Sequence, residues 1–233
     1  MAEIIPAILP SSLPDLRDHL GRIRGAARLV QIDFVDGIFA KNRTWPYTEG
    51  GRKEFDAIVA EEEGFPYWED FDFQFDLMVA RPADEVRALI AAGASSIIIH
   101  ALSAGALEGL RELQMLRDGD YPVSAGIALS ATAVPADLTP FVGLYDFVQV
   151  MGIDREGFQG EPFDEKALAL VAALCATYPE VPIQVDGAVT PENAGALMRA
   201  GAAALVVGHA IFRADDPKKE YRALYTSINA ERR

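Results

Sequence analysis

The sequence predicts a single α/β domain that closes into an eight-stranded (β/α)8 barrel, the TIM barrel. Short apolar runs rich in Ile and Val alternate with segments of helical periodicity along the chain. The runs carry few polar residues, which is typical of parallel strands buried on both faces. The chain has 233 residues, and one barrel domain typically has about 250. We therefore expect one domain over residues 1–233.

The strands are predicted from the apolar runs, each of which is followed by a turn. In chain order they are 4–8 (IIPAI), 29–33 (LVQID), 73–78 (FQFDLM), 96–100 (SIIIH), 124–129 (SAGIAL), 147–151 (FVQVM), 183–186 (IQVD) and 204–208 (ALVVG). Eight strands that alternate with helices imply a parallel sheet, and a barrel is the economical way to close it.

Helices are predicted between these strands. They are 13–23 (LPDLRDHLGRI), 82–93 (PADEVRALIAAG), 107–119 (LEGLRELQMLRDG), 164–178 (DEKALALVAALCATY) and 191–201 (PENAGALMRAG). Pro82, Asp164 and Thr190 are residue types that favour a helix start. Gly93 and Gly201 are placed to end a helix before the next strand.

The connection between the second and third strands, residues 43–72, is unusually long, and its tail EEEGFPYWEDFDFQ mixes acidic and aromatic residues. Long connections of this kind either pack on the surface of a barrel or carry a function. Two interpretations stay open for this one: a packed surface excursion, and a lid or subunit contact.

The composition excludes several classes of protein. With 21 basic and 35 acidic residues the net charge is −14, which argues against a nucleic-acid or anionic-membrane partner. Cys175 is the single cysteine, so no disulfide framework is expected. No stretch reads as a signal peptide or a membrane span. We expect a soluble, cytoplasmic protein.

Polar side chains stand at the ends of several predicted strands. In the stretch VQIDFVDGIF, Gln31 and Asp33 project to the same face of the strand. Asp76, His100 and Asp186 stand near the ends of the third, fourth and seventh strands. Three neighbouring carboxylates repel one another and lose hydration when buried, so they need a cation, a ligand or hydrogen-bond partners. The carboxyl ends of the strands, where barrel active sites lie, therefore hold the candidate site.

Glycines mark the loops after the last three strands. They are Gly157 and Gly160 in EGFQGEPF, Gly187 in DGA and Gly208 in GHAIF. Glycine lets the backbone approach a ligand closely, and these loops are the usual phosphate site of such barrels. The competing interpretation is that they are ordinary turn glycines.

These motifs together resemble the ribulose-phosphate 3-epimerase family over nearly the whole chain. The family pattern HxDxMDGxFxPN is matched by QIDFVDGIFAKN, and DxHLMV by QFDLMV. MxVxPGFGGQxF is matched by MGIDREGFQGEPF, with one extra residue before the GFQG segment, and VDGG is matched by VDGA.

The resemblance implies a mechanism and residue roles. Family members use two aspartates as acid and base on opposite faces of C3 of a ketose phosphate, with one divalent metal that stabilises an enediolate. Carried over to this chain, Asp33 and Asp186 are the acid and base, and Met78 and Met151 contact the substrate near the reacting carbon. The residues expected to hold the phosphate end are Gly157, Gly160, Gly187, Gly208 and, as a new contact, His209.

The metal site departs from the family pattern. Gln31 and Asp76 stand where the family has histidines, so the predicted ligands are Gln31, Asp33, Asp76 and Asp186, all oxygen donors. Such a set favours Mg or Mn over Zn. In a metal-free protein, a proton shared between the carboxylates is an alternative route to acid–base chemistry. No organic cofactor is expected.

The function predicted from these features is epimerisation or isomerisation of a small phosphorylated sugar. The alternative is a barrel that has lost catalysis and acts as a phosphosugar-binding or interaction protein. A decarboxylase or synthase of the same superfamily is a weaker alternative, because the lysine of its DxKxxD motif is absent from DLMVAR, residues 76–81. We also expect a homo-oligomer.

Overall fold

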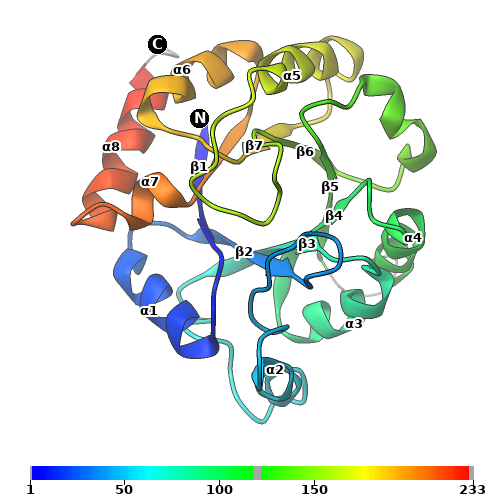
Figure 1. Cartoon of the computed structure of the whole chain (residues 1–233), viewed down its shortest axis with the longest axis vertical. Coiled ribbons are helices and arrows are strands. Elements are labelled where there is room, and N and C mark those ends of the chain that lie inside the picture. Colours follow the sequence, from blue (N-terminus) through cyan, green and yellow to red (C-terminus); the bar gives the residue numbers. More distant parts are fainter. Residues whose placement is uncertain (1, 118–121, 231–233) are drawn as a thin grey trace.

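The strands close into a barrel with helices around its outside (Figure 1). The computed structural model describes residues 2–117 and 122–230. All strand pairs are parallel and follow chain order from β1 to β8, and β8 pairs back to β1. The predicted TIM barrel is therefore confirmed.

The strands begin and end close to the predicted positions. They are β1 (Glu3–Ile8), β2 (Leu29–Val35), β3 (Asp72–Met78), β4 (Ala94–His100), β5 (Ser124–Leu129), β6 (Phe147–Met151), β7 (Ile183–Asp186) and β8 (Ala204–Val207). The helices between and after them are α1 (Leu13–Ile23), α2 (Gly51–Val59), α3 (Ala83–Ala91), α4 (Ala106–Arg117), the 3-10 helix η1 (Pro135–Phe141), α5 (Lys166–Thr177), α6 (Pro191–Ala200), α7 (His209–Phe212) and α8 (Pro217–Ala230).

Local hydrogen bonds explain where the helices begin. Asn193 accepts from the backbone N–H of Thr190 at 2.9 Å, which fixes the start of α6 as predicted. Helix α5 begins two residues after Asp164, because the Asp164 side chain accepts from the N–H of Lys166 at 3.0 Å. Gly201 ends α6 with φ of 116°, a backbone conformation that favours glycine.

Four helices in the described part of the chain were not predicted. Helix α2 lies inside the long 43–72 connection, η1 stands between β5 and β6, and α7 and α8 follow β8. The predicted helix 107–119 extends at least to Arg117, and its last two positions, Asp118 and Gly119, lie outside the described residues.

A cluster of aromatic rings packs the 43–72 connection against the outer face of the barrel. Phe34 on β2 contacts Trp45 at 5.8 Å and Phe55 at 5.5 Å between ring centroids. Phe65 contacts Phe75 on β3 at 5.7 Å, and all five side chains are buried. Trp45, Phe55 and Phe65 of this segment are therefore packed against the barrel, whereas a role as lid or subunit contact stays a prediction.

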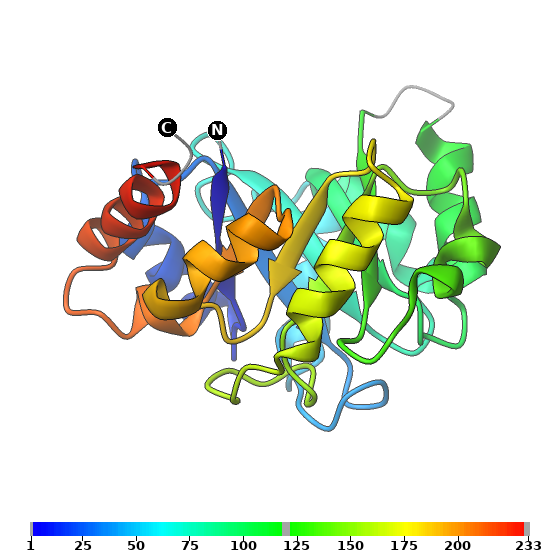
Figure 2. The same cartoon turned by 90° about the horizontal axis from the view of Figure 1, so that it is seen from above.

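The loops after β2 and β6 lie at the same end of the barrel. Strand β1 runs from the N-terminus at the upper edge of Figure 2 towards the lower edge, where both loops lie. This end therefore carries the carboxyl ends of the parallel strands. None of the helices in the described ranges is long and apolar enough to cross a bilayer.

Candidate active site

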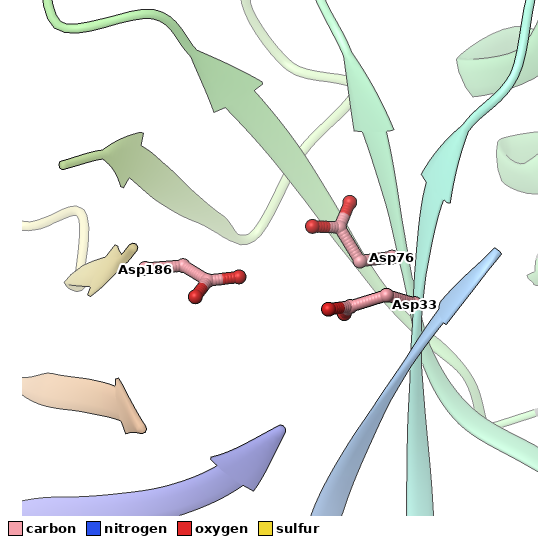
Figure 3. Close-up of side chains that lie close together, drawn as sticks. All are labelled: Asp33, Asp76 and Asp186. Atoms are coloured by element: carbon pink, nitrogen blue, oxygen red, sulfur yellow. The ribbon is translucent and has the colours of Figure 1, made fainter. Parts of the chain in front are cut away.

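Three aspartates converge inside the carboxyl end of the barrel. Asp33 and Asp76 are direct neighbours in the pairing of β2 with β3, and Asp186 is the last residue of β7. Figure 3 shows Asp186 pointing across the barrel towards the other two. One oxygen from each carboxylate can be chosen so that all lie within 4.8 Å of one another. The predicted convergence of strands β2, β3 and β7 is therefore present.

Burial and mutual repulsion raise the pKa values of Asp33 and Asp186. The exposed fractions of Asp33 and Asp186 are 3% and 8%. Loss of hydration, followed by the charges of Asp186 and Asp76, raises the pKa of Asp33 well above its ordinary value. Loss of hydration, followed by the charge of Asp76, raises the pKa of Asp186 to about 7. Near neutral pH this pair can therefore hold a proton.

Gln31 lies between Asp33 and Asp186, and it faces them with its amide nitrogen. Its Nε2 donates to Asp33 Oδ1 at 2.8 Å and to Asp186 Oδ2 at 2.6 Å. Its Oε1 accepts from Gln74 Nε2 at 2.8 Å. We predicted a metal-binding oxygen at Gln31, but in this structure Gln74 engages that oxygen.

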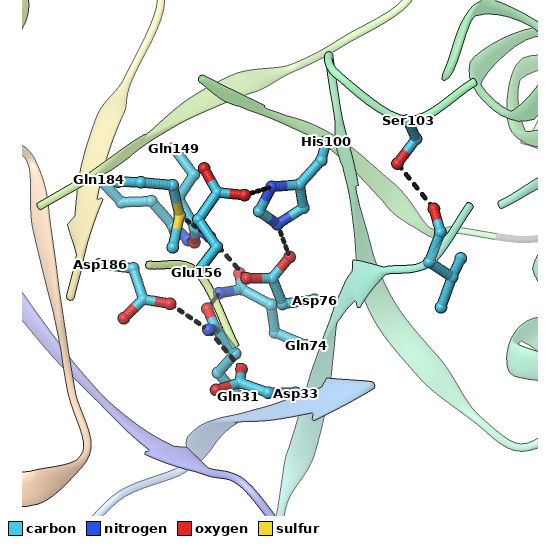
Figure 4. Close-up of polar contacts among 12 residues, drawn as sticks. Gln31, Asp33, Gln74, Asp76, His100, Ser103, Gln149, Glu156, Gln184 and Asp186 are labelled. Atoms are coloured by element: carbon cyan, nitrogen blue, oxygen red, sulfur yellow. Dashed lines mark hydrogen bonds and ion pairs between the residues drawn. The ribbon is translucent and has the colours of Figure 1, made fainter. Parts of the chain in front are cut away.

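Glutamines that the sequence motifs did not single out surround the acids (Figure 4). Gln149 Nε2 donates to Asp76 Oδ2 at 2.8 Å, and Gln184 Nε2 donates to Gln149 Oε1 at 2.5 Å. Together with Gln31 and Gln74 they are buried inside the barrel. A pattern in the sequence could have revealed Gln74 and Gln184, because QID, QFD and QVD each place a glutamine two residues before an aspartate, on the same face of its strand. Gln149 stands in FVQVM and lies outside this pattern.

His100 connects Asp76 to the loop after β6. Its Nε2 lies 2.8 Å from Asp76 Oδ1 and its Nδ1 lies 3.0 Å from Glu156 Oε2. Burial would lower the pKa of His100, but the Asp76 and Glu156 carboxylates outweigh that effect and raise this pKa well above its ordinary value. Glu156 directly precedes the GFQG segment, so the loop after β6 supplies this carboxylate.

A cavity of about 370 Å³ opens above the acids. The predicted residues that line it are Asp33, Met78, Met151, Gly157, Gly160, Asp186, Gly187, Gly208 and His209. Gln31 and Asp76 are not among the lining residues, and both are fully buried. The structure thus brings the predicted acid–base and substrate-contacting residues to one cavity.

The backbone around the cavity explains several of the glycines. Gly157, Gly160 and Gly187 have φ between 80° and 105°, where L side chains are strained. Ala188 has φ of 52° although it is not glycine, and such a conformation costs about 1–2 kcal/mol. Gly208 is needed for space rather than for φ, because a Cβ there would meet the side chain of Gln159 and the carbonyl oxygen of Ala7.

Gln159 is a further cavity residue that the sequence motifs did not assign to the site. It lines the cavity, and its Nε2 lies 3.4 Å from the carbonyl oxygen of Ala7. It stands where the family pattern GFGG has a glycine. The side chain therefore narrows the cavity beside Gly208 in a way that the family pattern does not predict.

The three aspartates could hold a metal ion. They offer oxygen ligands and a combined negative charge in a buried site, which is the chemistry that a divalent cation requires. Gln31 is not a fourth oxygen ligand in this arrangement, since its N–H groups face Asp33 and Asp186. The carboxylates therefore fit a cation, whereas the amide does not contribute to its binding as placed.

Comparison with known proteins identifies relatives over nearly the whole chain. Residues 3–212 match the ribulose-phosphate 3 epimerase family. The chain is 29% identical to the cytoplasmic isoform of ribulose-phosphate 3-epimerase from Oryza sativa subsp. japonica, over 97% of this chain and 94% of the rice protein. It is 30% identical to ribulose-phosphate 3-epimerase from Chlamydia muridarum, over 95% of this chain and 92% of that protein.

Solved structures share the barrel at lower identity. KGPDC from Streptococcus mutans has a TM-score of 0.74 at 12% identity, with 98% of each chain covered. The 3-hexulose-6-phosphate synthase from Salmonella typhimurium has a TM-score of 0.70 at 15% identity, over 98% of this chain and 99% of that one. These likenesses establish the fold alone. The match over residues 3–212 shows the family: this chain belongs to the ribulose-phosphate 3-epimerase family.

Proposed function

We propose that this protein is an epimerase of a small sugar phosphate, with ribulose 5-phosphate as the first substrate to test, and that Asp33 and Asp186 are its acid and base. The observation that carries the proposal is that these two carboxylates reach one cavity from β2 and β7. The epimerase names of the relatives from rice and Chlamydia muridarum support the same reaction.

The proton chemistry requires one acid and one base at the same time. The ionised carboxylate of the pair removes the C3 proton, and the electron pair of that bond moves towards the neighbouring carbonyl to give an enediolate. The protonated carboxylate then returns a proton to the opposite face of C3, which inverts that centre. The raised pKa values of Asp33 and Asp186 support this division of roles near neutral pH.

The phosphate end of the substrate is proposed to lie at the loops after β6, β7 and β8. Gly187 and Gly208 leave the backbone open to the cavity, and His209 lines it beside Gly160. Backbone N–H groups can hold an anion even in a chain of net charge −14. The synthase from Salmonella typhimurium, which has the same fold, is itself named for a sugar phosphate.

A divalent cation at Asp33, Asp76 and Asp186 would polarise the substrate carbonyl and stabilise the enediolate. Oxygen ligands favour Mg or Mn over Zn at such a site. Whether or not an ion is present, the residues that hold and move the C3 proton are the two aspartates at the cavity.

The alternatives are distinguished by chemistry at C3. A phosphosugar-binding protein that has lost catalysis would bind ribulose 5-phosphate without exchanging its C3 proton. A decarboxylase or synthase would make or break a carbon–carbon bond, and the absence of the DxKxxD lysine from residues 76–81 disfavours it.

The test follows the C3 proton of ribulose 5-phosphate in deuterated solvent by NMR, first with EDTA and then with added Mg or Mn. Loss of the C3 proton signal together with the appearance of xylulose 5-phosphate is the expected result. Absence of exchange under all of these conditions would contradict the proposal, and a binding measurement with the same compound would then test the non-catalytic alternative.

Self-association and a cytoplasmic location are also proposed. Ile38 and Leu102 are large apolar residues with exposed fractions of 76% and 71%, and such residues can form a contact between subunits. Light scattering on the purified protein gives the number of subunits. The rice relative is named as a cytoplasmic isoform, and imaging of the tagged protein in its own cells tests the location.

A further inference from the structure

A continuous chain of hydrogen bonds ends on the two proposed acid–base residues, and Figure 4 shows its members Gln74, Gln31, Asp33 and Asp186. The Ser96 hydroxyl donates to Gln74 Oε1 at 3.2 Å, and Gln74 Nε2 donates to Gln31 Oε1 at 2.8 Å. Gln31 Nε2 then uses both of its N–H groups, towards Asp33 Oδ1 at 2.8 Å and Asp186 Oδ2 at 2.6 Å. All members of this chain are buried.

The direction of the chain follows from its two ends. Ser96 is a hydroxyl, which can donate or accept, so it permits either orientation of the amides. A carboxylate oxygen that carries no proton only accepts, and at least one of the two acids is ionised in the proposed mechanism, so Asp33 and Asp186 favour the orientation that turns the Gln31 N–H groups towards them. The opposite orientation would bring the Gln31 oxygen against at least one ionised carboxylate, which is unfavourable unless a cation lies between them.

We propose that the Gln31 amide replaces the cation as the bridge between Asp33 and Asp186, so that proton transfer at C3 proceeds without a divalent ion. This inference rests on the proposed function and deepens it. One amide nitrogen contacts both carboxylates, as a bound cation would, and offsets part of their negative charge. Gln74 and Ser96 are positioning residues, because they act by holding the Gln31 amide in this orientation.

A second pair of glutamines provides a matched control. Gln184 donates to Gln149, and Gln149 donates to Asp76. Gln184 is buried in the same barrel interior as Gln74, with an exposed fraction of 5% against 2%, but its hydrogen bond leads to Gln149 and not to Gln31. The same change at Gln74 and Gln184 therefore separates loss of the Gln31 orientation from the general effect of an apolar side chain in the barrel.

The first experiment compares wild type with Gln31→Met, which keeps the length of the side chain but removes both its donors and its acceptor. The protein is treated with EDTA, its metal content is checked by mass spectrometry, and C3 proton exchange of ribulose 5-phosphate is followed by NMR. Wild type should exchange the proton under these conditions. The variant should lose roughly a hundredfold or more in rate, as is typical when a hydrogen-bond donor of an active site is removed.

The second readout is the affinity for Mn²⁺, measured by electron paramagnetic resonance without substrate. If Gln31 is a donor, Gln31→Met should bind Mn²⁺ at least as tightly as wild type, because no oxygen ligand has been lost. A tenfold weaker affinity would show that the amide oxygen is a metal ligand and would overturn the inference.

Gln74→Met and Gln184→Met test the orientation without altering Gln31 itself, and they keep the inference testable if Gln31→Met does not fold. The Gln74 variant should lose about tenfold in metal-free exchange, whereas the Gln184 variant should stay within about twofold of wild type; equal effects would contradict the role of Gln74.

The metal dependence of exchange by the wild-type protein distinguishes failure of this inference from failure of the proposed function. Exchange only with added Mg or Mn overturns the inference but leaves the epimerase, whereas absence of exchange in all conditions removes the epimerase itself.

Discussion

Asp186→Asn tests the assignment of the two carboxylates to opposite faces of the substrate. Asparagine keeps an oxygen that can accept from Gln31 Nε2, so the contact now present at 2.6 Å can remain. The change therefore removes the group that transfers the proton, while the side chain at position 186 keeps its place. A positioned acid or base typically contributes a factor of about 10²–10⁴, and a factor of ten corresponds to about 1.4 kcal/mol, so the barrier to epimerisation should rise by roughly 3–5 kcal/mol.

The informative result is an asymmetry between the two epimers. With Asp33 intact, the variant should still exchange the C3 proton of the epimer that presents this proton to Asp33. It should lose exchange with the other epimer. NMR in deuterated solvent with ribulose 5-phosphate and with xylulose 5-phosphate measures both rates, and Asp33→Asn should show the reverse preference. Equal loss for both epimers in both variants would refute the placement of the carboxylates on opposite faces.

Three further predictions concern the loops around the cavity. Ala188→Gly should raise the free energy of unfolding by about 1 kcal/mol, because relief of the strain at φ of 52° exceeds the entropy that glycine adds to the unfolded chain. Urea denaturation measures this free energy, and an unchanged value would mean that the backbone at Ala188 is not strained. Gly208→Ala should raise KM about tenfold with an unchanged circular dichroism spectrum, since the added Cβ meets Gln159 and the backbone beside it; an unchanged KM would place the ligand elsewhere. Glu156→Ala should lower the free energy of unfolding by about 2 kcal/mol, because the 3.0 Å contact with buried His100 is lost, and Glu156→Gln should lower it less. Equal stability of wild type and both variants in urea denaturation would show that the contact is not made in solution.

The fold could be predicted well because its signals are local. Each strand is a separate apolar run, and the chain order of runs and helices limits the topology. Helix α2 was missed because its sequence, GRKEFDAIV, is short and lies between stretches rich in turn-forming and acidic residues. Its formation depends on burial of Phe55 and Ile58 against the barrel, which is tertiary information that periodicity over so short a segment does not contain.

The convergence of the acids at the candidate site could be predicted, but not the surrounding glutamines or their hydrogen bonds. Strand alternation was sufficient to place Gln31 beside Asp33 and to bring Asp186 to the same end of the barrel. The orientation of the Gln31 amide depends on Gln74, which stands 43 positions away in sequence. Sequence patterns identify which side chains meet but contain little information on which atom of an amide faces its neighbour.

The aromatic cluster on the outer face of β2 has a consequence for how such a site can change. Phe34 joins β2 to Trp45 and Phe55 directly behind Asp33, so the wall that carries this acid is rigidly supported. The loop with Gly157 and Gly160 also lines the cavity, and the side chain of Gln159 lies between these two glycines. Recognition of the ligand can therefore be altered by exchanging a few loop residues, while the geometry of proton transfer stays as it is.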